Sequence, residues 1–160
     1  MTVKVGDSIP SVTVTALGAE GPGPLDTADL FKGKTVALFG VPGAFTPTCS
    51  AQHLPGFVSK AGDLKAKGVD EIVCMSVNDM FVMKSWAEAQ GAGDAVTMLP
   101  DGNGAFTEAL GLAFDASAFG MATRCQRFSL VAKDGKVTAI NIEEPGAFEV
   151  SGADTLLGQL

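Results

Sequence analysis

From Thr35 onward, short apolar and β-branched runs alternate with helix-like stretches, and this alternation restricts the fold more than any other feature of the sequence. A strand, a helix and a second strand in succession form a βαβ unit, in which the two strands run parallel. The predicted order is strand 35–39, helix 47–67, strand 71–77, helix 79–90, strand 96–99 and helix 105–110. The sequence therefore predicts an α/β fold around a parallel sheet.

The last third of the chain adds an antiparallel pair. Strands at 127–131 and 137–141 flank Lys133-Asp134-Gly135-Lys136, whose Asp-Gly step is a strong hairpin signal. A closing helix over 151–159 is expected to start from Ser151 as its cap. Together these elements predict a three-layer α/β/α sandwich, a thioredoxin-like fold with a mixed central sheet. Because no repeat or long linker divides the chain, residues 1–160 are expected to form a single domain.

Charge and hydropathy exclude some classes of partner. The chain has 11 basic and 18 acidic residues, a net charge of -7, and no Lys/Arg cluster, so a nucleic-acid partner is not expected. No stretch approaches the roughly 20 apolar residues of a membrane helix, and residues 1–7 lack the apolar run of a secretory signal. We therefore expect a cytoplasmic protein with no membrane partner.

The three cysteines have no close pair and fit neither a disulfide framework nor a zinc site. No metal or organic cofactor is implied. In a reducing compartment such cysteines are either buried packing residues or reactive thiols.

Cys49 is the third residue of the helix predicted to begin at Pro47. Thr46 is a good cap, and proline suits the first helical position because its missing N–H would be unpaired there. In that first turn, unbonded backbone N–H groups and the positive end of the helix dipole favour a thiolate over a thiol. The strand before it brings the helix start to the carboxyl edge of the sheet, where α/β proteins place their sites. Cys49 is therefore the candidate nucleophile rather than a packing residue.

The segment around Cys49 also carries a family resemblance. It reads Pro42-Gly43-Ala44-Phe45-Thr46-Pro47-Thr48-Cys49-Ser50 and continues with His53-Leu54-Pro55-Gly56-Phe57. This segment resembles the active-site region of type 5 peroxiredoxins, also called type II. Further agreement covers nearly the whole chain, in Val5-Gly6-Asp7, Phe31-Lys32-Gly33-Lys34, Leu38-Phe39-Gly40-Val41-Pro42, Cys74-Met75-Ser76-Val77-Asn78-Asp79 and Arg127-Phe128-Ser129.

The resemblance implies a thioredoxin-like fold and an antioxidant peroxidase. Such an enzyme reduces hydrogen peroxide and organic hydroperoxides to water and alcohols through a sulfenic acid, here at Cys49. It also implies that Pro42 and Thr46 shape and polarise the pocket, that Arg127 supplies a cation, and that the protein is a homodimer.

A thiolate alone does not make an efficient peroxidase, because groups that stabilise the breaking O–O bond must supply the larger share. Thr46 can aim its hydroxyl at that space. Arg124 and Arg127 flank the same stretch, but their odd spacing places them on opposite faces of a regular strand. At most one of them is expected to reach Cys49, and Arg124 is expected to be an exposed surface residue.

The oxidised sulfur must then be restored by a second thiol. Cys74, 25 residues after Cys49, aligns with the resolving cysteine of plant-like members, whereas residues 143–151 hold no later resolver. Cys74 also lies in an apolar run that predicts a buried strand, and a disulfide needs Cα atoms within about 7 Å. From the sequence, Cys74 is either a resolving cysteine or a buried packing residue. We favour an external thiol, which needs only an exposed Cys49: glutathione with glutaredoxin, or thioredoxin. Cys125 matches no residue of the family that we recognise, and we expect it to take no part in the reaction.

His53 lies four residues after Cys49 and so on the same helix face. A Cys-His pair would suggest a hydrolase, but no third orienting group is evident, so a structural or partner-facing role is expected. Pro55 is expected to kink the helix near Cys49, and such a weak point would help the first turn to open.

Two other functions use the same cysteine. One is a redox-sensing protein that passes oxidation from Cys49 to a partner. The other, a thiol-disulfide oxidoreductase, is disfavoured because Thr46 occupies the position where a Cys-x-x-Cys motif has its first cysteine.

Overall fold

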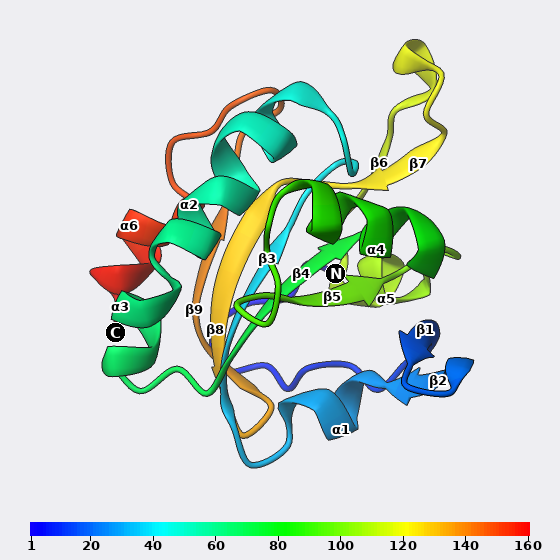
Figure 1. Cartoon of the computed structure of the whole chain (residues 1–160). Helices are drawn as coiled ribbons and strands as arrows, with labels where there is room; N and C mark the ends of the chain where they lie inside the picture. Colours follow the sequence, from blue (N-terminus) through cyan, green and yellow to red (C-terminus); the bar gives the residue numbers. More distant parts are fainter.

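A five-stranded mixed sheet forms the centre of the computed structural model, which describes residues 1–160 (Figure 1). The strand order is β5-β4-β3-β8-β9; β3, β4 and β5 run parallel, and β8 pairs antiparallel with β3 and β9. The elements are β1 (Thr13–Gly18), β2 (Gly21–Asp26), α1 (Thr27–Phe31), β3 (Thr35–Gly40), the π-helix η1 (Cys49–His53), α2 (Leu54–Ser59), α3 (Ala61–Ala66), β4 (Glu71–Ser76), α4 (Met80–Ala89), β5 (Thr97–Pro100), α5 (Ala105–Leu110), β6 (Ala113–Asp115), the 3-10 helix η2 (Ser117–Phe119), β7 (Thr123–Cys125), β8 (Phe128–Lys133), β9 (Lys136–Ile142) and α6 (Ala153–Leu157).

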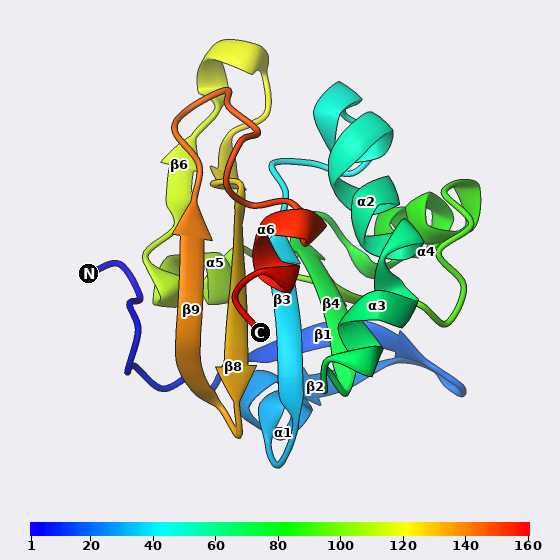
Figure 2. The ribbon, with the colours of Figure 1, turned by 90° about the vertical axis from the view of Figure 1, so that its left-hand side faces the viewer.

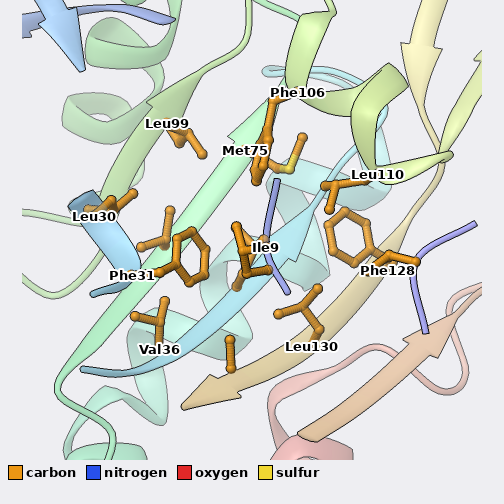
Figure 3. Packing of buried hydrophobic residues seen from close by; sticks show 14 of the residues in the cluster. Ile9, Leu30, Phe31, Val36, Met75, Leu99, Phe106, Leu110, Phe128 and Leu130 are labelled. Carbon is orange, nitrogen blue, oxygen red and sulfur yellow. The ribbon is translucent and has the colours of Figure 1, made fainter. Parts of the chain in front are cut away.

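Two apolar layers cover the sheet because successive side chains of a strand point to opposite faces. Along β3, Val36 and Leu38 join one cluster, and Ala37 and Phe39 join the other. The first cluster packs against α1, α5 and the N-terminal segment and is shown in Figure 3. The second packs against α2, α3, α4 and α6, and α6 crosses in front of the sheet in Figure 2. The predicted three-layer sandwich with a mixed sheet is thereby confirmed.

The hairpin between β8 and β9 follows from its turn residues. Asp134 and Gly135 both have positive φ, 48° and 76°, as a two-residue turn of type I′ requires. This predicted antiparallel pair is confirmed. No helix of the structure combines the length and the apolar character needed to span a membrane.

The helix predicted over 47–67 is interrupted twice. Residues 47–48 are helical, but the chain then widens into the π turn η1, in which the Leu54 N–H donates to the Cys49 carbonyl. Pro55 accounts for the wider turn, because it has no N–H to donate and its ring crowds the carbonyl four residues earlier. At the position where a kink is predicted, the structure has this π turn. A second break at Lys60 separates α2 from α3.

The antiparallel ribbons β1–β2 and β6–β7 were not predicted. The sequence of β2 is Gly-Pro-Gly-Pro-Leu-Asp, which has poor strand propensity, and β6 and β7 have three residues each. The β6–β7 ribbon projects beyond the sheet (Figure 1). Ser151 is not the cap of the last helix: α6 follows Gly152, and the Ser151 hydroxyl instead donates to Glu143 at 2.6 Å.

Candidate active site

Cys49 lies just past the end of β3, in the first turn of the helix. The loop before it is held by Asn78, whose Oδ1 accepts from the Ala44 N–H at 3.0 Å and from the Ser76 hydroxyl at 2.6 Å. The Ser50 N–H donates to the Thr46 carbonyl at 2.9 Å, so Thr46 occupies the cap position and Cys49 is the third helical residue, as expected. The Cys49 side chain has no exposed surface.

The structure brings Arg127 to the sulfur. Its Nη2 lies 3.2 Å from Cys49 Sγ, although the two residues are 78 positions apart. Arg127 directly precedes Phe128, which points into the first apolar cluster, so alternation along β8 turns Arg127 toward the opposite face, where Cys49 lies.

Arg124 does not contact Cys49, but the expectation that it is merely exposed is wrong. It is half-buried, and its guanidinium donates to the Met121 carbonyl at 2.9 Å and the Pro42 carbonyl at 3.3 Å. These bonds tie the projecting β6–β7 ribbon to the loop before Cys49.

His53, the last residue of η1, is fully buried, with its ring 4.9 Å from that of Phe39 and 5.0 Å from that of Phe148. Its Nδ1 lies 3.0 Å from Arg127 Nη1, and its Nε2 lies 2.9 Å from the Ser151 carbonyl. Burial and the Arg127 charge lower the pKa of His53 to about 3, so the ring is neutral at physiological pH.

These contacts decide between the sequence-based roles for His53. A guanidinium only donates, so Nδ1 uses its lone pair on Arg127 and cannot accept a proton from Cys49. The Cys-His pair of a hydrolase is therefore not formed. A partner-facing role is also wrong, because the ring is inside the protein. No local pattern in the sequence indicates the contact with Arg127, which lies 74 positions away.

A cavity of about 730 Å³ opens beside Arg127. Pro42, Thr46 and Arg127 all line it, and the Cys49 sulfur lies 3.2 Å from the Arg127 guanidinium. The Thr46 hydroxyl donates to the Gly43 carbonyl at 2.6 Å, so it does not cap the helix and its oxygen keeps an accepting lone pair. The other lining residues are Pro47, Thr48, Phe114, Ala116, Phe119, Met121, Gln126, Glu143, Glu144, Pro145, Gly146 and Ala147.

The remaining cysteines are also buried, and none of the three forms a disulfide. Cys74 lies on β4, between its partners on β3 and β5, and belongs to the same apolar cluster as Cys49. Burial, followed by the nearby Cys49 and Cys125, raises the pKa of the Cys74 thiol well above its usual range. Cys125 lies in the opposite cluster, where burial likewise raises its pKa.

The expectation of an exposed Cys49, ready for direct attack by an external thiol, is wrong. The side chain packs into the second apolar cluster, and Arg127 lies against the sulfur. A thiol larger than a peroxide therefore needs the first helical turn to open.

Comparisons with known proteins cover nearly the whole chain. The model of the Redoxin family matches residues 4–157. Peroxiredoxin-2C of Oryza sativa subsp. japonica is 50% identical over 159 residues, which cover 99% of this chain and 98% of the rice protein. Peroxiredoxin-2B of Arabidopsis thaliana is 48% identical over 161 residues, with 99% and 98% covered. The crystal structure of reduced Prx3 from Vibrio vulnificus in complex with hydrogen peroxide superposes with a TM-score of 0.94, at 48% identity and 98% coverage of both chains.

Proposed function

The chain belongs to the peroxiredoxin family of thiol peroxidases, and from this premise we propose that its Cys49 reduces hydrogen peroxide and organic hydroperoxides to water and alcohols. One observation carries the assignment of the residue. Of the three buried cysteines, Cys49 is the one whose sulfur receives a hydrogen bond from an arginine, and that arginine lines a cavity. A cation at the sulfur favours the thiolate, which is the nucleophilic form.

The chemistry follows from this arrangement. The Cys49 thiolate attacks the terminal oxygen of the peroxide, the O–O bond breaks, and the sulfur becomes a sulfenic acid. The departing hydroxide or alkoxide takes up a proton and leaves as water or an alcohol. Arg127 stabilises the charge that moves from sulfur to the leaving oxygen, Thr46 offers its hydroxyl oxygen to the peroxide proton, and Pro42 shields the sulfur from water.

We assign the chain to the type 5, or type II, branch. The resemblance of residues 42–57 supports this assignment, as do the plant relatives named Peroxiredoxin-2. The branch suggests a homodimer. The phenylalanines Phe45 and Phe119 support that suggestion, because they are 54% and 78% exposed, Phe119 lines the cavity, and exposed apolar side chains are typical of a surface that a partner covers.

An external thiol is the proposed reductant, either glutathione with glutaredoxin or thioredoxin. The thiol attacks the sulfenic sulfur and releases water, and a second thiol then frees Cys49 from the mixed disulfide. Because Cys49 is buried, this half-reaction requires the π turn before Pro55 to unwind. Similar protection of that turn from hydrogen exchange in the reduced and disulfide-linked forms would contradict this step.

Turnover distinguishes a peroxidase from a redox sensor. We expect sustained consumption of hydrogen peroxide in the presence of glutathione and glutaredoxin, or of thioredoxin and its reductase. A single stoichiometric oxidation of Cys49, with no further consumption under any of these reductants, would favour the sensor instead.

A further inference from the structure

Glu143 makes five hydrogen bonds with one short segment of the chain. The Glu149 N–H donates to both carboxylate oxygens at 2.9 Å, and one of these oxygens also accepts from the N–H groups of Val150 and Ser151 at 2.8 Å and from the Ser151 hydroxyl at 2.6 Å. Residue 143 follows β9, and residues 144–152, the strap, arch from there to α6 (Figure 2). A buried carboxylate with this many donors holds the strap in one conformation.

The strap in turn delivers one acceptor to His53. The Ser151 carbonyl lies 2.9 Å from His53 Nε2. Because Nδ1 accepts from Arg127, Nε2 must carry the ring proton, and it donates this proton to the Ser151 carbonyl. Phe148 of the strap packs on the His53 ring and lies 5.8 Å below the Arg127 guanidinium. The strap therefore selects the tautomer of His53 and covers the ring.

Glu143 also contacts Arg127 through a backbone hydrogen bond: the Glu143 N–H donates to the Arg127 carbonyl at 3.0 Å. A chain of contacts thus runs from Glu143 through Ser151 and His53 to the Arg127 guanidinium, whose other nitrogen lies against Cys49 Sγ. Every member of this chain has a defined donor or acceptor role.

We propose that Glu143 is a positioning residue of the peroxidase: by holding Ser151 it fixes the neutral His53 tautomer that aims Arg127 at Cys49. The inference rests on the proposed function, since it concerns how the cation of that reaction is oriented. Glu143 itself touches neither the sulfur nor His53 in any hydrogen bond.

The ionisation state of Glu143 suits this role. Burial acts to raise the pKa of Glu143, but hydrogen bonds from Ser151, Glu149 and Val150 outweigh it and lower the pKa. The side chain is therefore a carboxylate at physiological pH, which can accept from all four donor groups of the strap.

Glu143→Ala tests the proposal, with Glu149→Ala as a matched control. The control removes an exposed carboxylate from the same strap and keeps the backbone N–H that Glu143 accepts. We expect Glu143→Ala to slow the oxidation of Cys49 by hydrogen peroxide about tenfold or more, measured by stopped flow, and the control to change it less than about twofold.

The tautomer and titration of His53 distinguish a positioning role of Glu143 from a purely structural one. They can be measured directly, because His53 is the one histidine of the chain. In the wild type, the ¹⁵N shifts of its ring should report the Nε2–H tautomer, neutral to about pH 3. In Glu143→Ala the strap is released from the ring, and because burial is the largest cause of the low His53 pKa, we expect the ring to titrate closer to its ordinary value of about 6.5, although the lost carboxylate charge acts in the opposite direction. The charged or ionisable groups that face it are Arg127, Cys49 and Glu143. A protonated His53 would repel Arg127, so peroxide reduction by the variant should lose activity below about pH 6 while the wild type shows no such loss.

Ser151→Ala provides a second variant in case Glu143→Ala does not fold. It removes the hydroxyl bond to Glu143 but keeps the carbonyl that faces His53, so we expect the same changes at smaller amplitude. An unchanged His53 tautomer and titration in both variants, or unchanged peroxide reduction, would overturn the proposal. So would an additive loss when Glu143→Ala is combined with Arg127→Ala, since residues acting through one another do not add.

The two proposals fail differently. If the wild type did not turn over peroxide, the proposed function would fail, although the His53 shifts could still depend on Glu143. If the wild type were an active peroxidase whose His53 ignored Glu143, only the positioning role would fail.

Discussion

Cys49 and Cys74 lie in the same apolar cluster, and neither exposes any surface, yet their surroundings differ in two respects. The Cys49 sulfur receives a hydrogen bond from Arg127, and its backbone belongs to the π turn η1 at an irregular helix start. Cys74 has no such partner, its thiol pKa is raised by burial, and its backbone lies between two bonded strands. Since both side chains are fully buried, burial does not distinguish the two sulfurs, and the proposed reactivity of Cys49 rests on one distant cation and an irregular helix start.

The largest effect should come from removing the reactive sulfur itself. Cys49→Ser replaces the thiolate by a hydroxyl that is not ionised at neutral pH, so peroxide consumption should fall by at least about a thousandfold. A coupled assay with excess reductant measures it. Cys125→Ser serves as the control, because Cys125 lies on the opposite face of the sheet. An active Cys49→Ser protein would end the proposed function.

Removing the cation should make Cys49 resemble Cys74. Arg127→Ala leaves the sulfur buried without a charged donor, and we expect the rate constant for peroxide reduction to fall by about 10²- to 10³-fold. Arg127→Lys keeps the charge but cannot donate to Cys49 and His53 in the same fixed geometry, so it should recover only part of the loss. Stopped-flow measurements under pseudo-first-order conditions separate the three proteins, and full activity of Arg127→Ala would contradict the role.

The neutral His53 should also be visible in the stability of the protein. Its pKa is about 3 in the folded protein and ordinarily 6.5, so the unfolded chain binds the proton first as the pH falls. The stabilisation from this group is complete above about pH 6.5 and should decrease by about 1.4 kcal/mol per pH unit down to about pH 3. Urea unfolding across this range measures the slope, and His53→Gln, which cannot titrate, should show a shallower dependence.

Much of the fold was predictable because its signals are local. The strand runs, the Asp134-Gly135 turn and the Thr46-Pro47 helix start are each written within a few neighbouring residues. Cys49 was predictable for the same reason. The choice of Arg127 came from the family resemblance; alternation along a single strand does not separate the two arginines, because Arg124 lies on β7 and Arg127 lies between β7 and β8.

The contacts of His53 were not predictable, because they join it to Arg127 and Ser151, 74 and 98 positions away, and these segments meet only when the sheet has formed. Ser151 illustrates the difficulty. Its residue type suggests a helix cap, but the tertiary structure gives its hydroxyl to Glu143.

A smaller effect is expected from the contact that holds the first turn closed. The indole N–H of Trp86 on α4 donates to the Ser50 hydroxyl at 2.9 Å, next to Cys49. Ser50→Ala leaves this buried donor unpaired, which costs on the order of 1 kcal/mol, so opening of residues 49–53 should become about fivefold more frequent. Amide hydrogen exchange measures the opening, with Gln52→Ala as the control because Gln52 is exposed on the same turn. Equal exchange in both variants would show that Trp86 does not restrain the turn.

Cys74→Ser should have the smallest effect and is the sharpest test of the comparison. If an external thiol restores Cys49, this variant should keep activity within about twofold with glutathione and glutaredoxin, because Cys74 then acts only as a packing residue and serine is of similar size. A loss of activity confined to the thioredoxin-dependent assay would instead make Cys74 a resolving cysteine. That outcome requires the helix to unwind toward β4, since β4 is bonded on both sides and cannot move toward Cys49. Mass spectrometry of the oxidised wild type under non-reducing conditions decides the matter independently: a Cys49–Cys74 disulfide would break the distinction drawn between the two sulfurs, and a glutathione adduct on Cys49 alone would uphold it.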